Sequence, residues 1–125
     1  MKFTKLIPNI FYADIKVGLQ LFVDCLGFTI VHSDPEGEQP FYVISKDNLA
    51  IHLIESAEFA AKDRPELRLE AANIDEAFAE ISSKFPGLLH PNLKAVTLRP
   101  WNAKEFALRD SSGVCIVIFQ WPDKG

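Results

Sequence analysis

The order of helix and strand signals repeats along this chain, and this repeat limits the possible folds more than any other feature. Each half carries one strand, one amphipathic helix and three further strands, at an offset of about 60 residues. Short strands grouped after a single helix predict an α+β domain in which helices cover one face of a sheet. Each half is too small to be stable alone, so both halves, or two chains, must share sheet faces.

The first half is a module of about residues 4–55. Its signals predict a helix over 15–26 and strands over 6–12, 28–32, 41–45 and 49–55. Asp14 is a good N-cap for the helix, and Gly27 supplies its stop. Pro8 cannot donate to a strand ladder, so the first strand must lie at a sheet edge or change direction there. Residues 56–64 are polar and rich in alanine, and we expect them to be a linker.

The second half is a module of about residues 65–121. Its signals predict a helix over 74–85 and strands over 66–70, 93–98, 105–109 and 114–120. Asn73 with Glu76 three residues later forms a capping box at the start of the helix. We expect the two modules to form a single domain over 1–125.

Charge and composition exclude several classes of function. The net charge is −4, and no cluster of Lys and Arg offers the basic footprint that nucleic acid requires. No apolar run reaches the roughly 18 residues that span a bilayer, and the N-terminus shows no signal-peptide core, so we expect a cytoplasmic protein. Cys25 and Cys115 lie in apolar surroundings without metal-type spacing, and we expect buried reduced thiols.

Trp101 follows a proline in a loop, directly before the strand over 105–109 and the turn at 110–113. A tryptophan at the mouth of a sheet is a candidate ligand platform, because its face can stack and its N–H can donate a hydrogen bond. The alternative is that Trp101 packs on other aromatic side chains, such as Phe41 or Trp121.

Several motifs together resemble the glyoxalase/bleomycin-resistance/extradiol-dioxygenase (vicinal oxygen chelate) superfamily, and its bleomycin-resistance branch above all. They are Asp14 before the first helix, Leu26-Gly27-Phe28 at its end, Pro100-Trp101, the run Lys104 to Asp110, and Gly113. The resemblance spans about residues 6–121 and implies two tandem βαβββ modules forming a curved mixed sheet around a cleft, with helices outside. Two departures are Asn102-Ala103 in place of the usual glycine after the tryptophan, and Ser111 to Val114 in place of an Asp-Pro-x-Gly-Asn turn.

Enzymes of this superfamily hold a divalent metal with four side chains. By resemblance those positions fall here on Ile7, His52, Glu66 and Val117, and only the histidine and the glutamate can ligate. A catalytic site usually needs at least three protein ligands. We therefore expect no metal and no other cofactor, and a binding protein in preference to an enzyme. The alternative is a metal-dependent lyase, isomerase or dioxygenase that uses His52 and Glu66 with a further, unrecognised ligand.

Other titratable groups are weaker candidates. Glu66 and Glu70 share one strand face and flank Arg68, which allows either acid–base work or a solvated face with an ion pair. His32 and His90 are expected near loops, away from the face that carries His52.

The resemblance implies a homodimer whose interface clefts sequester a planar, cationic small molecule. The positions that would line each cleft are Phe41, His52, Glu66 and Trp101, with Phe41 and Trp101 as the stacking pair. Pro8 marks the place where an N-terminal strand would cross to the partner chain, with a plain edge proline as the alternative. A further possibility is a scaffold protein with a vestigial cavity.

Overall fold

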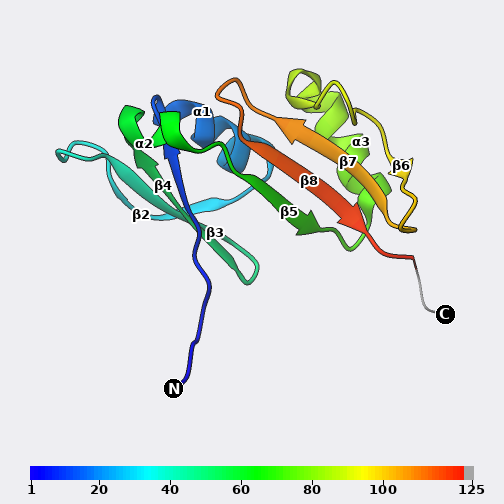
Figure 1. Ribbon diagram of the computed structural model, residues 1–125, viewed down its shortest axis with the longest axis horizontal. Coiled ribbons are helices and arrows are strands. Elements are labelled where there is room, and N and C mark those ends of the chain that lie inside the picture. The colour runs from blue at the N-terminus through cyan, green and yellow to red at the C-terminus, as the bar shows by residue number, and fades with distance from the viewer. Residues whose placement is uncertain (123–125) are drawn as a thin grey trace. The chain divides into compact units, whose positions relative to one another are not determined.

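The computed structural model describes residues 1–122, and it divides into two compact units, Met1–Asp63 and Arg64–Gly125 (Figure 1). Each unit holds one four-stranded mixed sheet, and the order strand, helix, three strands occurs in both. The predicted α+β class and the two tandem βαβββ modules are therefore confirmed. The eight described strands form two sheets of four strands each.

The first unit has the sheet order β1-β4-β3-β2, with β1 parallel to β4 and the other pairs antiparallel. Its elements are β1 (Asn9–Tyr12), α1 (Ile15–Leu19), the π-helix η1 (Gln20–Cys25), β2 (Thr29–Asp34), β3 (Phe41–Lys46), β4 (Leu49–Glu55) and α2 (Ala57–Lys62). The first strand is shorter than predicted and begins directly after Pro8. The carbonyl of Pro8 still accepts a hydrogen bond from His52 N at 3.0 Å, but the proline itself cannot donate to the ladder.

The helix predicted over 15–26 is only half α-helical. After Leu19 it continues as a π-helix, in which Leu26 N donates to Leu21 O at 3.0 Å. Gly18, which lowers helix propensity, is required by packing: a Cβ at this position would lie 2.5 Å from the ring of the fully buried Tyr12. The close approach of the ring to the helix backbone therefore outweighs the propensity cost, which is about 1 kcal/mol.

The expected linker contains the short helix α2. Ser56 caps it, accepting a hydrogen bond from Phe59 N at 3.3 Å, and the Phe59 ring lies 5.1 Å from that of Phe11. The boundary between the two units falls directly after this helix, between Asp63 and Arg64.

The second unit has the sheet order β5-β8-β7-β6, with β5 parallel to β8. Its elements are β5 (Glu66–Glu70), α3 (Ile74–Lys84), the short 3-10 helix η2 (Pro86–Leu88), β6 (Thr97–Leu98), β7 (Lys104–Arg109) and β8 (Cys115–Gln120). Helix α3 lies along one face of the sheet (Figure 1), where Phe78 meets Phe106 edge to face at 5.2 Å. The Gln120 side chain fixes the start of α3, accepting from Ile74 N at 2.8 Å and donating to Ala72 O at 3.0 Å.

Strand alternation decides what the opposite face of this sheet presents. The registers place Glu70, Phe119 and Glu105 in one row across β5, β8 and β7, on the face away from α3. The row of Arg68, Val117 and Ala107 lies beside it. This polar and aromatic face carries the candidate site.

The prediction of a strand over 93–98 is mostly wrong, because only Thr97 and Leu98 pair as a strand. Pro91 has no N–H, and the chain turns there, with Leu93 N donating to His90 O at 3.0 Å. His90 N and Leu93 O instead bond to the two backbone groups of Ala107. The segment thus follows β7 without a regular ladder.

Candidate functional site

Trp101 lies in the tight turn that joins β6 to β7. Asn102 N donates to Arg99 O at 2.8 Å, and Arg99 N donates to Ala103 O at 2.8 Å. Asn102 has φ 73°, the left-handed conformation that glycine adopts most easily and asparagine tolerates better than most residues. This explains how the chain makes the turn without the glycine usual after this tryptophan. The Trp101 side chain remains 49% exposed.

Glu105, four residues after Trp101, is a buried carboxylate at the centre of a charged cluster. It is only 2% exposed, and its Oε2 accepts hydrogen bonds from Arg68 Nη2 and, at 2.9 Å, from the indole N–H of Trp101. Arg99 approaches from the other side, with its Nε 3.9 Å from Oε1. The buried carboxylate is therefore hydrogen-bonded by one cation and one neutral donor and faces a second cation, as a charge removed from water requires.

Two cation–π contacts complete this cluster. The Arg99 guanidinium lies 4.9 Å from the centre of the Trp101 ring, and that of Arg68 lies 5.0 Å from the Phe119 ring. The ring of Trp101 is thus held by a hydrogen bond at its edge and by a cation on a face. Because its indole N–H already donates to Glu105, Trp101 can offer a ligand only the surface of its ring.

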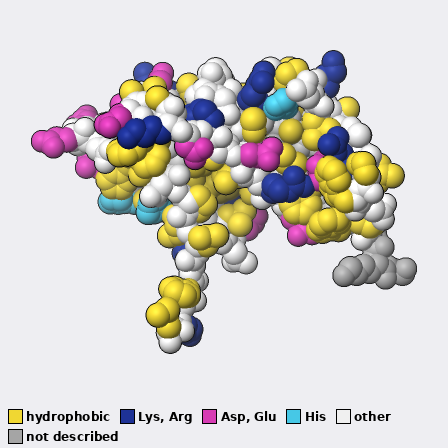
Figure 2. All heavy atoms as spheres, viewed as in Figure 1, with side chains coloured by type: hydrophobic (Ala, Val, Ile, Leu, Met, Phe, Trp, Pro, Cys, Tyr) yellow, Lys and Arg dark blue, Asp and Glu magenta, His cyan; other side chains and the backbone are white. Residues whose placement is uncertain are grey.

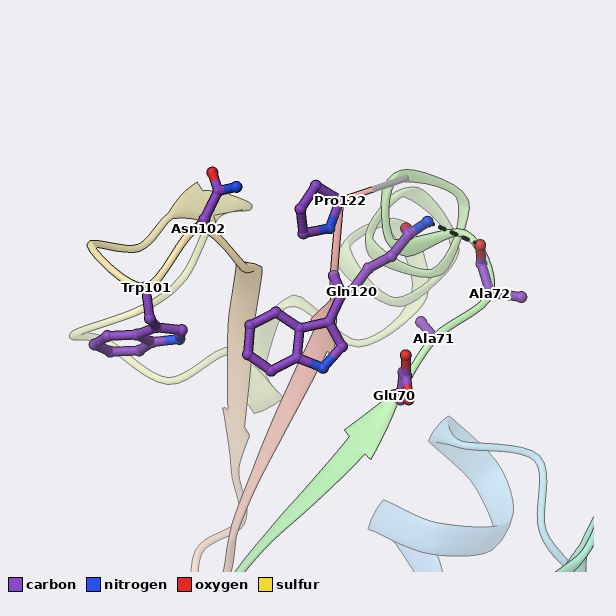
Figure 3. A pocket seen from close by; sticks show the side chains of 8 residues that line it. Glu70, Ala71, Ala72, Trp101, Asn102, Gln120 and Pro122 are labelled. Carbon is purple, nitrogen blue, oxygen red and sulfur yellow. Dashed lines mark hydrogen bonds between the residues drawn. The ribbon is translucent and has the colours of Figure 1, made fainter. Parts of the chain in front are cut away.

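A cleft of about 760 Å³ opens beside Trp101. It is lined by Glu70, Ala71, Ala72, Trp101, Asn102, Gln120, Trp121 and Pro122, all from the second unit. Figure 3 shows Glu70 at the end of β5 and Trp101 on the other side, with Gln120 at the end of β8 between them. This volume lies within the range of small-molecule sites, about 300–1,000 Å³.

Phe41 and His52, two of the four residues expected to line the cleft, belong to the first unit. Phe41 begins β3, half-buried, with its ring 5.6 Å from that of His32. His32 lies near the end of strand β2 and on the same sheet face as His52, so the expectation that it lies away from that face is wrong. The register aligns His32, Val43 and His52 across the sheet, on the face away from the buried Ile51 and Leu53.

Glu66 and Trp101, the other two, belong to the second unit. Glu66 begins β5, is exposed, and shares its face with Arg68 and Glu70, as predicted. The ion pair on this face differs from the expectation. Arg68 reaches across β8 to Glu105 and does not pair with the acids of its own strand.

The positions implied for a metal do not fit one. The side chains of Ile7 and Val117 have no donor atom, so only His52 and Glu66 could ligate. Over residues 1–122, no group of three or more His, Cys, Asp or Glu side chains is placed to hold a metal ion. Two donors fall short of the three that a catalytic site usually needs.

Three residues of the site escaped the sequence analysis: Glu105 as a buried anchor, and Glu70 and Trp121 as walls of the cleft. Glu105 could have been found from its spacing, because it follows Trp101 by four residues, across a turn. The alternation that puts Phe119 and Trp121 on one face of the chain is a signal for the last, and the two rings meet edge to face at 6.0 Å.

Cys25 and Cys115 form no disulfide within residues 1–122, and both are only half-buried, so the expectation that they are buried is wrong. Burial raises the pKa of the Cys115 thiol, as do the nearby carboxylates of Glu66 and Asp110, against the opposing charge of Arg109. The thiolate is thus disfavoured, and the thiol is a poor nucleophile at neutral pH.

Fold and site together define a protein with a small aromatic binding cleft. Bleomycin resistance proteins of Geobacillus stearothermophilus and Staphylococcus aureus are 30% identical to this chain over 131 residues, covering 91% of it and 94% of each relative. No model of a known protein family matches the chain. The chain belongs to the bleomycin resistance protein family.

Solved structures show the same fold at lower identity. The bleomycin-binding protein of Streptomyces verticillus, complexed with copper(II)-bleomycin, matches 98% of this chain and 99% of its own with a TM-score of 0.71 and 19% identity. A superfamily member from Sphaerobacter thermophilus matches 94% of this chain and 98% of its own with a TM-score of 0.71 and 16% identity. In the part of the chain that is described, no helix has the length and apolar character to cross a bilayer.

Proposed function

We propose that this protein binds and sequesters a planar, cationic small molecule of the bleomycin type, without transforming it. The observation that carries the proposal is the half-exposed ring of Trp101, fixed by the buried Glu105 at the edge of a cleft of about 760 Å³. A ring held in one orientation loses little freedom when a flat ligand stacks on it, and each stacking contact adds roughly 0.5–1.5 kcal/mol beyond area burial. The names of the 30% identical relatives point to the same kind of ligand.

We further propose that the working form is a cytoplasmic homodimer in which the two units of each chain act as one domain. The N-terminal arm supports an assembly. Phe3 and Leu6 are 85% and 88% exposed, and no strand pairing is found before Asn9 (Figures 1 and 2). Apolar side chains on an extended arm gain by packing on a second copy, and exchange at Pro8 would supply that contact. In such a dimer Phe41, His52 and Glu66 would line the cleft with Trp101.

A calorimetric titration with copper-free bleomycin tests the binding proposal. We expect saturable binding to the wild type at ligand concentrations near ~100 µM, a level that reveals roughly micromolar affinity, and at least about tenfold weaker binding to Trp101→Ala. Leu49→Ala is a control, because Leu49 is an exposed apolar residue that lines neither this cleft nor the smaller one beside it. Absence of binding to the wild type, or equal binding to Trp101→Ala, would reject the proposal.

Light scattering during gel filtration tests the assembly. We expect the mass of a dimer for the wild type, and a shift to monomer in a variant with Phe3 and Leu6 both changed to Ser. A monomeric wild type would reject the dimer, and a variant that remains fully dimeric would reject the role of the arm.

A further inference from the structure

We propose that Trp121 and Glu70 form, with Trp101, a subsite that holds the positively charged part of a planar ligand. The inference rests on the proposed function and assigns chemistry to two further residues that line the same cleft as Trp101. It depends on three features of the second unit: a second exposed indole, a carboxylate that has no partner within residues 1–122, and two polar neighbours, Gln120 and Trp101, that already make hydrogen bonds.

Trp121 follows β8 and is 49% exposed, the same fraction as Trp101. Its ring meets Phe119 edge to face at 6.0 Å with an interplanar angle of 80°, a contact that fixes the ring and leaves much of it open. Both tryptophans line the same cleft. Two indoles that line one cavity offer a flat ligand two aromatic surfaces, and tryptophan is the aromatic residue that attracts cations most strongly.

Glu70 supplies the charge. Its row across the sheet contains two carboxylates, Glu70 and Glu105, on either side of Phe119. Glu105 is buried and neutralised by Arg68 and Arg99, so it has no charge to offer a ligand. Glu70 is exposed, and within residues 1–122 its carboxylate has no hydrogen bond or ion pair. Of the two acids, only Glu70 is free to face a cation in the cleft.

Because other polar side chains of the cleft already make hydrogen bonds, we expect charge to contribute more than hydrogen bonding to the choice of ligand. Gln120 uses its oxygen on Ile74 N and its nitrogen on Ala72 O, which ties it to the start of α3 (Figure 3). The indole N–H of Trp101 is bonded to Glu105. Within residues 1–122, the groups left to a ligand are aromatic surface, the carboxylate of Glu70, the Asn102 amide and the N–H of Trp121, and this combination suits a flat organic cation.

Calorimetric titrations with two probes of similar shape test the subsite at pH 8. Proflavine is a planar cation at this pH, and acridine is its neutral counterpart. We expect the wild type to bind proflavine more tightly than acridine. Glu70→Gln should weaken proflavine binding about threefold to fivefold and leave acridine binding unchanged, since an exposed ion pair contributes little more than this. Trp121→Ala should weaken both about tenfold, while Trp121→Phe keeps most of the affinity.

Glu76→Gln is the matched control for charge, because Glu76 is an exposed acid of the same unit, in the first turn of α3, and does not line this cleft. Circular dichroism of each variant checks that the fold is kept. The subsite is overturned if neither probe binds the wild type, or if Trp121→Ala binds both as the wild type does. The role of Glu70 is overturned if Glu70→Gln binds proflavine unchanged, or loses both probes equally.

The same variants titrated with copper-free bleomycin separate this inference from the proposed function. Bleomycin binding that is equal in the wild type, Trp121→Ala and Glu70→Gln supports the function and overturns the subsite. Proflavine binding that depends on Trp121 and Glu70, in a protein that does not bind bleomycin, supports the subsite and rejects a ligand of the bleomycin type.

Discussion

Replacing Glu105 with glutamine tests whether a buried charge holds Trp101 in place. Glutamine keeps the size of the side chain and an acceptor for the indole N–H, but it removes the charge that faces Arg68 and Arg99. A hydrogen bond between charged groups contributes about 1.5–3 kcal/mol. Because the arginine side chains are 44% and 35% exposed, solvent screens part of this. We expect the free energy of unfolding to fall by about 1–2 kcal/mol.

Urea unfolding followed by circular dichroism measures this loss. Glu66→Gln is the control, since this exposed residue of the same sheet face should change stability by no more than about 0.5 kcal/mol. Fluorescence in a Trp121→Phe background reports on Trp101 alone, because the chain has two tryptophans. Glu105→Ala should shift the Trp101 emission to longer wavelength as the ring loses its anchor. A Glu105→Gln loss no larger than that of the control, with unchanged emission in Glu105→Ala, would refute the reasoning.

Three further changes test the local structure, each by urea unfolding. Gly18→Ala should cost about 1–3 kcal/mol, because its Cβ would overlap the Tyr12 ring, and a neutral effect would contradict the packing described. Asp110→Ala should cost about 2–3 kcal/mol, because the buried carboxylate accepts three hydrogen bonds within the β7–β8 turn, and a loss below 1 kcal/mol would count against this. Asn102→Val should cost about 1–3 kcal/mol while Asn102→Gly stays near neutral, since only the former strains the left-handed backbone; equal effects would argue otherwise.

Much of the fold could be predicted because its signals are local. Apolar spacing and capping residues indicated both helices, and β4 runs over the residues that alternation predicted. The predictions failed where contacts between residues far apart in the sequence determine the local structure. The π-helix after Leu19 has no signal in its own residues, and the strand expected over 93–98 is replaced by a turn at Pro91 whose backbone bonds to Ala107.

The site could be predicted only in part for the same reason. Trp101 is recognisable from its loop and from the strand that follows it. The burial of Glu105 depends on Arg68, which is 37 residues away in the sequence and reaches it only because β8 lies between β5 and β7. Likewise Glu70 meets the cleft beside Trp121 because β5 pairs in parallel with β8. The order of strands in a sheet cannot be inferred from the periodicity of the individual strands.

Trp101 fluorescence during a titration with copper-free bleomycin tests the central claim most directly. In the Trp121→Phe variant, we predict a saturable change in Trp101 emission, with about one ligand bound per chain and the same dissociation constant as calorimetry gives. Calorimetric binding accompanied by constant Trp101 emission would contradict the claim that a ligand of this class stacks on Trp101.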